Sequence, residues 1–423
     1  MSGVEFLSSD KRLCRGFSWA RKQAMEYVRD QAAAGPCYEA ALPGRDAFCM
    51  RDAAHQSGGA HCLGLMKHNR NMMRLFASNI DPGRDFCTYW EITSEGLPAP
   101  VDYTNDSDFW YNLPANFDVT YACSRLYDLT GDPGYLLDRE MSDFHRISTD
   151  EYVLRWDRDG DGIVDRVKSD GRRGIASYDE GRTNGYKTAA DALSLQYAAF
   201  MAAARMYALK GEPDRSGDLR AKALKLQRIF NDEWWDEDLR RFHEFRAADG
   251  GFITAASFDN ALAPLRCGII TDRRRMDGQI DYLLSLESGM NVEVRSYVPL
   301  VLWKYGRDRD ALRVWLKMTD ESYPRREYPE ISYAAVEGLV FGYMGIECGA
   351  EGTFATRPAL RENEWAQITD LPLWDGTVSL RHEGGKCSRL VNETGKTIRW
   401  SACFGKDTVF RIVPPGQSAE AGS

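Results

Sequence analysis

The sequence contains no run of about 18 apolar residues, so a membrane-spanning helix is not expected. It also lacks any run rich in Lys and Arg, and its formal net charge is −9. Nucleic acid and anionic membranes are therefore not expected as partners. The polar start at residues 1–5 lacks the apolar core of a signal peptide, which predicts a cytoplasmic protein. A neutral substrate suits this composition better than nucleic acid or an anionic membrane does.

Several familiar catalytic signatures are missing as well. The ten cysteines form no CxxC pair and no regular spacing, which favours buried reduced thiols over disulfides or a zinc site. The six histidines show no HExxH spacing. Neither a Gly-x-Ser-x-Gly turn nor a phosphate-binding glycine-rich loop is present. No organic cofactor is expected.

Paired helices are the main pattern that the sequence does contain. Residues 189–210 are rich in alanine and apolar nearly all round, which is typical of a helix packed on every side. In the next segment apolar residues recur at spacings of four and three, as in a helix with one exposed face: Leu219, Ala223, Leu226 and Phe230. An inner helix is therefore expected to pair with an outer one.

A stop signal for helices recurs along the chain. An aromatic residue stands about one turn before a glycine suited to a left-handed helix end at Gly131, Gly211, Gly306 and Gly345. Similar hairpins in series predict a repeat architecture. About eleven candidate helices lie between residues 11 and 344, close to the twelve of six hairpins. We therefore expect a mainly α fold, an (α/α)6 toroid, over residues 1–360.

The period changes near the C-terminus. Ile398, Trp400, Ala402 and Phe404 alternate with less apolar residues, and glycines stand where turns should be. This alternation predicts a small antiparallel β module over residues 361–423, whose expected role is to pack on the barrel.

Long polar segments rich in aromatic and acidic residues separate the helices, at residues 85–117, 151–187 and 323–332. Long loops on a compact scaffold are usually functional. Sugars present hydroxyls and C–H faces, so aromatic rings beside carboxylates and amides suit a sugar site. The candidate sugar contacts are Arg51, Asp52, His55, Gln56, Trp90, Glu91, Trp110, Tyr111 and Asn112. Alternatively, the aromatics fill the barrel ends and His55 is a structural histidine.

Glycosidic cleavage needs one protonated carboxyl group and a second carboxylate that activates water or attacks directly. Among 63 acidic residues, candidates should lie in an aromatic loop next to a helix start. Asp179 and Glu180 meet this condition, as do Glu327 and Glu330. Helix capping or a salt bridge is the alternative role for each pair.

Two short segments resemble a known superfamily. The segment FCMRD at residues 48–52 resembles the Arg-Asp sugar-binding motif of six-hairpin glycosidases. The segment SYDE at residues 177–180 is similar to the place where glucoamylase-like, trehalase-like and bile-acid β-glucosidase-like enzymes keep the general acid. The resemblance implies an (α/α)6-barrel glycoside hydrolase with a carbohydrate substrate. It makes Asp179 the proton donor and Glu180 a neighbouring contact or the alternative donor.

The resemblance also implies roles for further residues. Arg51 and Asp52 would bind the sugar that is released, beside Tyr178. The second carboxylate would be Glu330, which precedes the last inner helix, with Glu327 and Glu293 as alternatives. Inversion is implied by the trehalase-like and glucoamylase-like relatives, whereas the β-glucosidase-like relatives retain configuration.

One acidic segment has the spacing of a calcium loop. Asp157, Asp159, Asp161 and Asp165 occupy loop positions 1, 3, 5 and 9, and a glycine stands at position 6. The backbone carbonyl of Ile163 is a further candidate ligand. Position 12 is Lys168 instead of the usual glutamate. We expect Ca²⁺ here, because four clustered carboxylates would otherwise repel one another; a solvated acidic turn is the alternative.

Two other function classes compete with hydrolysis. A sugar epimerase or lyase on the same barrel would use His or Tyr for proton transfer. A carbohydrate-binding protein without catalysis would keep the aromatic cleft and lack turnover.

Overall fold

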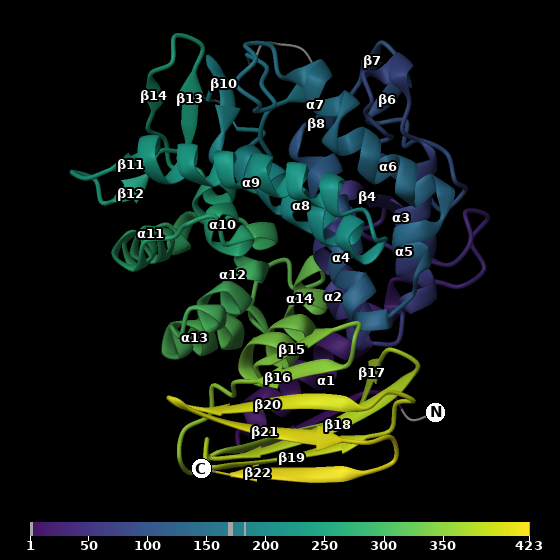
Figure 1. The fold of residues 1–423 in the computed structure, drawn as a ribbon, viewed down its shortest axis with the longest axis vertical. Helices are drawn as coiled ribbons and strands as arrows, with labels where there is room; N and C mark the ends of the chain where they lie inside the picture. The colour runs from purple at the N-terminus through teal and green to yellow at the C-terminus, as the bar shows by residue number, and fades with distance from the viewer. Residues whose placement is uncertain (1–2, 168–171, 182, 423) are drawn as a thin grey trace.

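The structure is a computed structural model that describes residues 3–167, 172–181 and 183–422 (Figure 1). In this part of the chain twelve helices form a barrel of six inner and six outer helices, which confirms the predicted (α/α)6 toroid. The inner helices are α2 (Met50–Cys62), α4 (Pro114–Thr130), α8 (Ala190–Leu209), α10 (Phe258–Cys267), α12 (Val292–Lys304) and α14 (Pro329–Glu337). The outer helices are α3 (Met66–Ser78), α6 (Arg139–Thr149), α9 (Pro213–Glu233), α11 (Arg273–Ser285), α13 (Asp308–Met318) and α1 (Lys11–Glu26).

The inner helices form a closed ring, since each contacts the next and α14 returns to α2. Helix α1 packs on α14, so the sixth hairpin combines the first helix of the chain with the last inner helix. A π-helical turn at Gly338–Tyr343 follows α14. None of the helices that the structure describes is long and apolar enough to cross a membrane.

The inner and outer helices differ in burial as their sequences predict. Helix α8 is buried on nearly every side, whereas α9 buries mainly the predicted stripe of Leu219, Ala223, Leu226 and Phe230. Gly131 follows the end of α4, and Gly211 follows the end of α8. Their φ angles of 66° and 78° confirm the predicted left-handed helix ends.

The helices α2 and α14 approach each other closely at Gly59. A Cβ atom at this position would lie 2.1 Å from the carbonyl oxygen of Tyr333, which is far inside contact distance. Only glycine therefore allows this approach. The neighbouring Gly58 leaves room for the carboxylate of Glu337 in the same way.

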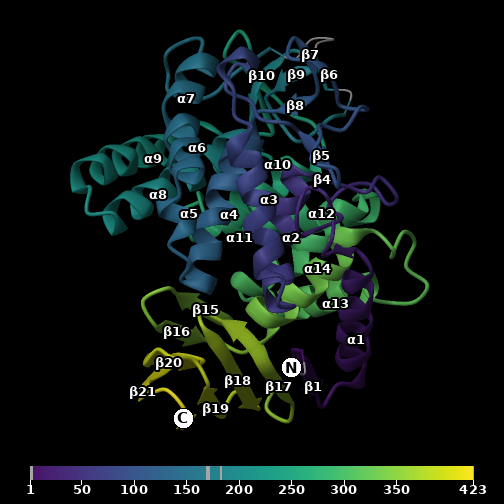
Figure 2. The same cartoon turned by 90° about the vertical axis from the view of Figure 1, so that its right-hand side faces the viewer.

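Short strands and long loops cover the barrel end where the inner helices begin (Figure 1, Figure 2). Strand β4 pairs with β5, β8 with β9, and β10 with β13, so these loops are fixed by backbone hydrogen bonds. The strands are β4 (Ala47–Cys49), β5 (Glu91–Thr93), β6 (Tyr103–Asn105), β7 (Asp108–Phe109), β8 (Tyr111–Asn112), β9 (Arg173–Ile175), β10 (Tyr186–Ala189), β13 (Phe245–Ala247) and β14 (Phe252–Ile253). The remaining short elements are β2 (Val28–Arg29), β3 (Cys37–Tyr38), β11 (Trp235–Asp236), β12 (Arg241–Phe242), α5 (Gly134–Leu137), α7 (Glu151–Trp156) and the 3-10 helices η1 (Pro82–Arg84) and η2 (Glu287–Gly289).

The predicted β module lies at the opposite end of the barrel (Figure 1, Figure 2). One sheet has the order β1 (Glu5–Ser8), β17 (Trp365–Leu373), β18 (Gly376–Glu383), β19 (Cys387–Asn392) and β22 (Ser418–Gly422). The other has the order β15 (Ile346–Gly349), β16 (Thr353–Thr356), β20 (Ile398–Phe404) and β21 (Asp407–Val413). The alternating apolar residues of β20 are buried, as predicted.

The sheets also hold features that the sequence pattern does not predict. Strand β16 runs parallel to β20, while the other pairs in these two sheets are antiparallel. Strands β15 and β16 precede residue 361, and β1 joins from the first residues of the chain. The two sheets therefore hold strands from both sides of the domain boundary predicted after residue 360, and that boundary stays a prediction.

Candidate active site

A cavity of about 320 Å³ opens at the barrel end where the inner helices begin. Ligand pockets usually measure about 300–1,000 Å³, so this volume suits one small ligand. The predicted residues that line it are Arg51, Asp52, Trp90, Glu91, Trp110, Glu180 and Glu293. Lining residues that the sequence analysis did not single out are Ala41, Leu42, Arg45, Cys49, Asp102 and Tyr328.

The barrel itself explains why carboxylates gather at this end. An acidic residue stands in the first turn of five inner helices: Asp52, Asp191, Asp259, Glu293 and Glu330. The partial positive charge of a helix N-terminus stabilises a carboxylate there. Because the inner helices all begin at the same end, residues far apart in sequence converge on one site.

Glu330 is a fully buried carboxyl group beside this cavity. Its Oε1 accepts a hydrogen bond from the hydroxyl of Tyr297 at 3.1 Å, and its Oε2 has no donor among the described residues. Burial, followed by the neighbouring Asp52 carboxylate, holds the pKa of Glu330 well above its usual value. Such a group is a strong base once it is ionised.

Asp52 and Arg51 form the polar start of α2. Asp52 is 2% exposed, and its Oδ1 accepts a hydrogen bond from Nε of Arg51 at 3.1 Å. Burial raises the pKa of Asp52, although the Arg51 guanidinium opposes the rise. Asp52 and Glu330 therefore titrate as a pair, and the arginine favours the charge on Asp52.

The structure separates the two adjacent candidates for the general acid. Asp179 uses its Oδ1 to accept the backbone N–H of Gly181 at 2.8 Å and is not a lining residue. Glu180 does line the cavity. The Glu180 residue is exposed, but partial loss of water around its carboxyl group, followed by the negative charge of Asp52, raises its pKa against the opposing effect of Arg51. Glu180 is therefore better placed than Asp179 to reach a ligand in the cavity.

Asp191 holds the loop that carries Asp179 and Glu180 through hydrogen bonds. The Oδ2 atom of Asp191 accepts the backbone N–H of Tyr178 at 2.6 Å and the hydroxyl of Ser177 at 2.9 Å. Asn112 adds a hydrogen bond from Nδ2 to the carbonyl of Ser177 at 2.5 Å and accepts one from Nε1 of Trp110 at 2.8 Å. Asn112 therefore positions the loop instead of lining the cavity.

Several other predicted contacts lie behind the lining residues. Tyr178 is buried, and the guanidinium of Arg51 stands over its ring at 5.6 Å. Gln56 and Tyr111 are fully buried, and neither lines the cavity. The exposed Glu327 likewise does not line it, and its carbonyl accepts a hydrogen bond from Tyr27.

A buried charged network connects the inner helices α2, α4 and α10. Asp118 is fully buried, and its carboxylate accepts hydrogen bonds from Nη2 of Arg266 at 3.0 Å and from the Tyr178 hydroxyl at 3.2 Å. His55 Nε2 lies 2.6 Å from the same carboxylate. Burial, followed by the charge of Arg266, lowers the pKa of His55 to about 4, so the ring is neutral. This geometry suits a structural role for His55.

One acid next to the cavity was missed by the sequence analysis. Burial raises the pKa of Asp259 to about 6, with Arg51 opposing the rise and Asp179 and Glu180 adding to it. Asp259 stands in the first turn of α10, and its position after a loop and before an inner helix is the signal that could have revealed it.

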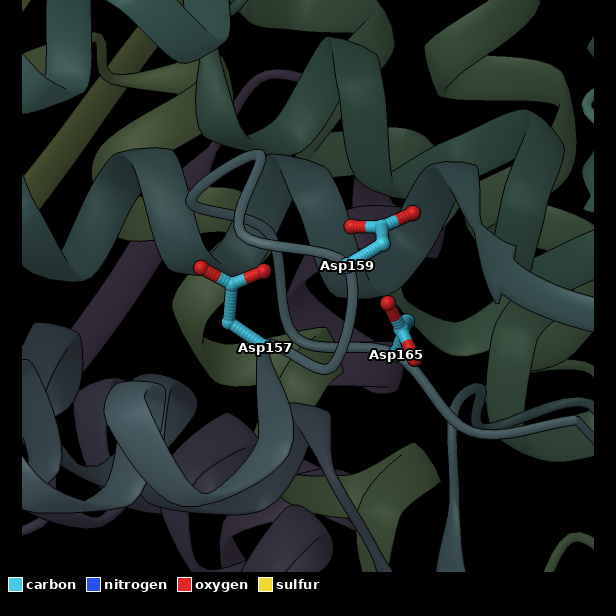
Figure 3. A group of neighbouring side chains, drawn as sticks. All are labelled: Asp157, Asp159 and Asp165. Atoms are coloured by element: carbon cyan, nitrogen blue, oxygen red, sulfur yellow. The ribbon is translucent and has the colours of Figure 1, made fainter.

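The acidic loop places three of its four predicted aspartate ligands together (Figure 3). Carboxylate oxygens of Asp157, Asp159 and Asp165 lie within 4.8 Å of one another. Calcium–oxygen distances of about 2.3–2.6 Å allow ligands this far apart across an ion. Burial and Asp159 raise the pKa of Asp165 to about 6, which indicates negative charge that is incompletely compensated.

Two contacts in this loop differ from the predicted ligand set. Asp161 is outside the group, and its Oδ1 accepts the backbone N–H of Ile163 at 2.8 Å. The ammonium of Lys187 pairs with Asp159 and supplies part of the compensating charge. Lys168, at position 12 of the loop, lies outside the described residues.

Comparison with known proteins identifies the fold. No family model matches the chain, and no curated protein matches it. Among solved structures, the chain is similar to a GH78 family rhamnosidase of Bacillus sp. GL1, with a TM-score of 0.61 and 16% identity over 93% of this chain. It is also similar to a protein assigned as a kojibiose phosphorylase from the human microbiome, with a TM-score of 0.66 and 10% identity over all of this chain.

A third similar structure is a glycosidase solved as its E335A variant in complex with glucose, with a TM-score of 0.57 and 12% identity. The match covers 79% of this chain and 98% of that glycosidase. The chain spans 41% of the rhamnosidase and 67% of the phosphorylase. These likenesses show that the chain has the six-hairpin (α/α)6 fold of these proteins.

Proposed function

We propose that the protein is a glycoside hydrolase that acts in the cavity at the start of the inner helices. The observation that carries the proposal is a carboxyl group in the lining, Glu180, together with a fully buried carboxyl group, Glu330, that interacts with the lining residue Asp52. Full burial raises the pKa of Glu330, and partial loss of water around its carboxyl group raises the pKa of the exposed Glu180. A glycosidase needs two carboxyl groups in one site, one that donates a proton and one that is ionised when it activates water.

In this mechanism Glu180 donates a proton to the oxygen of the leaving group. Glu330 accepts a proton from the water that attacks the anomeric carbon, and the hydroxyl of Tyr297 orients its carboxyl group. The expected outcome is inversion, because Glu330 then activates water instead of forming a bond to the sugar. Asp179 remains the alternative donor if the loop shifts by one residue.

The other lining residues suit sugar binding. Trp90 and Trp110 offer aromatic faces for the C–H groups of a sugar ring. Arg51 and Asp52 supply a donor and an acceptor for sugar hydroxyls, with Glu293 as a further acceptor.

The ion pairs of the two arginines in the lining favour hydrolysis over phosphorolysis. Arg45 pairs with Glu91 at 2.7 Å, and Arg51 pairs with Asp52 at 3.1 Å. Phosphate binding usually employs arginine or lysine groups that are free to form bidentate contacts. Here both guanidinium groups already have carboxylate partners in the same lining.

The remaining candidates have weaker support. An epimerase or lyase that used histidine in this cavity would need the ring in its lining, whereas His55 is not a lining residue and its neutral ring is held by Asp118. A binding protein without catalysis would not need an acid as deeply buried as Glu330.

The test is a screen of aryl glycosides and oligosaccharides with the wild type and three variants. Glu330→Gln should lose activity on every substrate. Glu180→Gln should lose most on substrates with poor leaving groups and least on dinitrophenyl glycosides, which need little protonation. Glu327→Gln is the matched control and should keep full activity. NMR of the first-formed anomer then reports inversion or retention.

Two results would remove the proposal. Wild-type turnover by Glu330→Gln would exclude that residue from the chemistry. A protein that binds sugars but turns over no substrate, and whose affinity is the same in Glu330→Gln and Glu180→Gln, would be better explained as a carbohydrate-binding protein.

We also propose that the acidic loop binds Ca²⁺ through Asp157, Asp159 and Asp165, supported by their converging oxygens. Asp161, whose Oδ1 accepts the backbone N–H of Ile163, would join only after a local rearrangement, and the carbonyl of Ile163 stays a candidate ligand.

A further inference from the structure

Two consecutive turns shape the loop that carries the candidate proton donor. The hydroxyl oxygen of Ser177 accepts the backbone N–H of Asp179 at 2.9 Å, and Oδ1 of Asp179 accepts the backbone N–H of Gly181 at 2.8 Å. A side-chain oxygen that binds the N–H two residues later fixes the direction of the chain between them. Glu180 lies inside the second turn, so the Asp179 carboxylate controls the backbone that carries the Glu180 side chain.

The first turn is anchored to the barrel. Ser177 is fully buried, and its hydroxyl donates to Oδ2 of Asp191 at 2.9 Å and accepts a hydrogen bond from Nδ2 of Asn260 at 3.3 Å. Together with the bond from Asp179, these contacts use the donor and both acceptor sites of the hydroxyl. Asp191 stands in the first turn of α8 and Asn260 in that of α10, so two inner helices hold Ser177. The backbone N–H of Asp179 therefore has a fixed place relative to the barrel.

The second turn occupies the carboxylate of Asp179 at close range. A Cβ atom at Gly181 would lie 2.6 Å from Oδ1 of Asp179, so the glycine makes room for this oxygen. Asp179 is not a lining residue of the cavity, whereas Glu180 is. The two neighbouring carboxyl groups thus have different surroundings, since the first bonds the backbone of its own loop and the second reaches the space for a ligand.

We propose that Asp179 is a positioning residue, whose carboxylate holds the turn that directs Glu180 into the cavity, and that Ser177 sets the start of this turn. This role rests on the proposed function, in which Glu180 donates the proton to the leaving group. In this role Asp179 needs an oxygen that accepts a hydrogen bond, and it needs neither a proton nor a charge. The two turns also oppose the shift of one residue that would bring Asp179 to the place of the donor.

The test compares Asp179→Asn with Asp179→Ala on phenyl and dinitrophenyl glycosides of one sugar that the wild type hydrolyses. Asparagine keeps an oxygen that accepts the Gly181 N–H but cannot act as an acid, whereas alanine removes the turn. Asp179→Asn should keep kcat/KM within about threefold of the wild type on both substrates. Asp179→Ala should lose about 100-fold on the phenyl glycoside, because a misplaced catalytic group costs about this much.

The dependence on the leaving group separates positioning of the acid from a general structural role. Asp179→Ala should lose far less on the dinitrophenyl glycoside, whose leaving group needs little protonation. The loss should fall on kcat instead of KM, because Asp179 does not line the cavity.

A second variant and a control make the result specific. Ser177→Ala removes the first turn and should show the same dependence on the leaving group. The control is Asp249→Ala, because Asp249 makes the same kind of turn, in which its Oδ1 accepts the N–H of Gly251 at 3.0 Å. Asp249 is exposed and does not line the cavity, so this variant should keep wild-type activity. Thermal unfolding of each variant shows that it is folded.

Hydrogen exchange followed by mass spectrometry tests the turn without any substrate. A peptide that contains Gly181 should take up deuterium faster in Asp179→Ala than in the wild type, because its N–H has lost the carboxylate acceptor. The uptake in Asp179→Asn should match that of the wild type.

Equal loss of activity in both Asp179 variants would overturn the inference, because it would show that this residue needs its proton or its charge. Wild-type activity of Asp179→Ala would overturn it as well. Either result can occur while Glu180→Gln behaves as proposed, which would refute the positioning role and leave the proposed function standing. Equal deuterium uptake in the wild type and both variants would refute the turn itself, whether or not the protein hydrolyses glycosides.

Discussion

Replacing Asp118 by asparagine should destabilise the barrel by about 3–5 kcal/mol, because it removes the charge that compensates a buried arginine. The Asp118 side chain is fully buried, and that of Arg266 is only 13% exposed. Their closest contact joins Nη2 and Oδ1 at 3.0 Å. Asparagine keeps the volume of the side chain and can still accept from Tyr178, so the loss reports the charge and not a void.

A companion variant and the double variant isolate this interaction. Arg266→Met leaves the Asp118 carboxylate without its cation and should cost a similar amount. The double variant should cost less than the sum of the two single variants by about 3 kcal/mol, since no buried charge is left uncompensated. Replacing the whole pair is thus far milder than breaking it.

The assay is urea unfolding followed by circular dichroism and by tryptophan fluorescence. Coincident transitions justify the free energies, and a lower midpoint with an unchanged slope identifies a loss of stability. Burial alone would raise the pKa of Asp118, but Arg266 and His55 outweigh it and lower the pKa. The contribution is therefore complete above the unfolded pKa of about 3.9 and is lost as the pH falls below it.

The difference between the wild type and Asp118→Asn should accordingly stay constant from pH 7 to about pH 4 and shrink at lower pH. Single variants that each cost less than about 1 kcal/mol, with additive effects in the double variant, would refute the reasoning.

Three further outcomes are expected. Gly59→Ala should destabilise the protein by about 1–3 kcal/mol or more, because its Cβ would meet the backbone of Tyr333. Gly217→Ala, in open space on α9, should instead stabilise the protein by about 0.5–1 kcal/mol. Urea midpoints that shift in the same direction in both variants would contradict this. Added Ca²⁺ should raise the melting temperature of the wild type and not of Asp157→Asn, and an equal rise in both would exclude the loop. Activity should fall as the pH drops through the raised pKa of the Glu330 pair, because the base must be ionised; a profile that is flat down to pH 4 would contradict this role.

The barrel was predictable because its signals are local. A short stretch of sequence is enough to show that α8 is apolar on every side and that α9 has a single apolar stripe, and these patterns predict which residues are buried. Gly131 and Gly211 mark helix ends through their backbone angles. The parallel pair of β16 and β20 was not predictable, because strand direction depends on where the intervening chain travels.

The site was predictable in part for the same reason. Arg51 and Asp52 stand at a helix start, which the sequence reveals, and they line the cavity. The sequence cannot separate Asp179 from Glu180, because the choice depends on the turn that Asp179 makes with Gly181. Arg45 and Asp102 were missed because they come from loops whose convergence is set by β4 and β5 pairing.

The split sixth hairpin has a consequence for synthesis on the ribosome. Helix α1 buries Leu13, Phe17 and Ala20, and its inner partner α14 begins only at Pro329. At about 5–20 residues per second, α1 waits roughly 15–65 s before its partner is made. During that time its apolar stripe faces solvent, and β1 likewise waits for β17. Chaperone binding and aggregation of the nascent chain should therefore concentrate on this first helix, and early folding should proceed from the central hairpins outward.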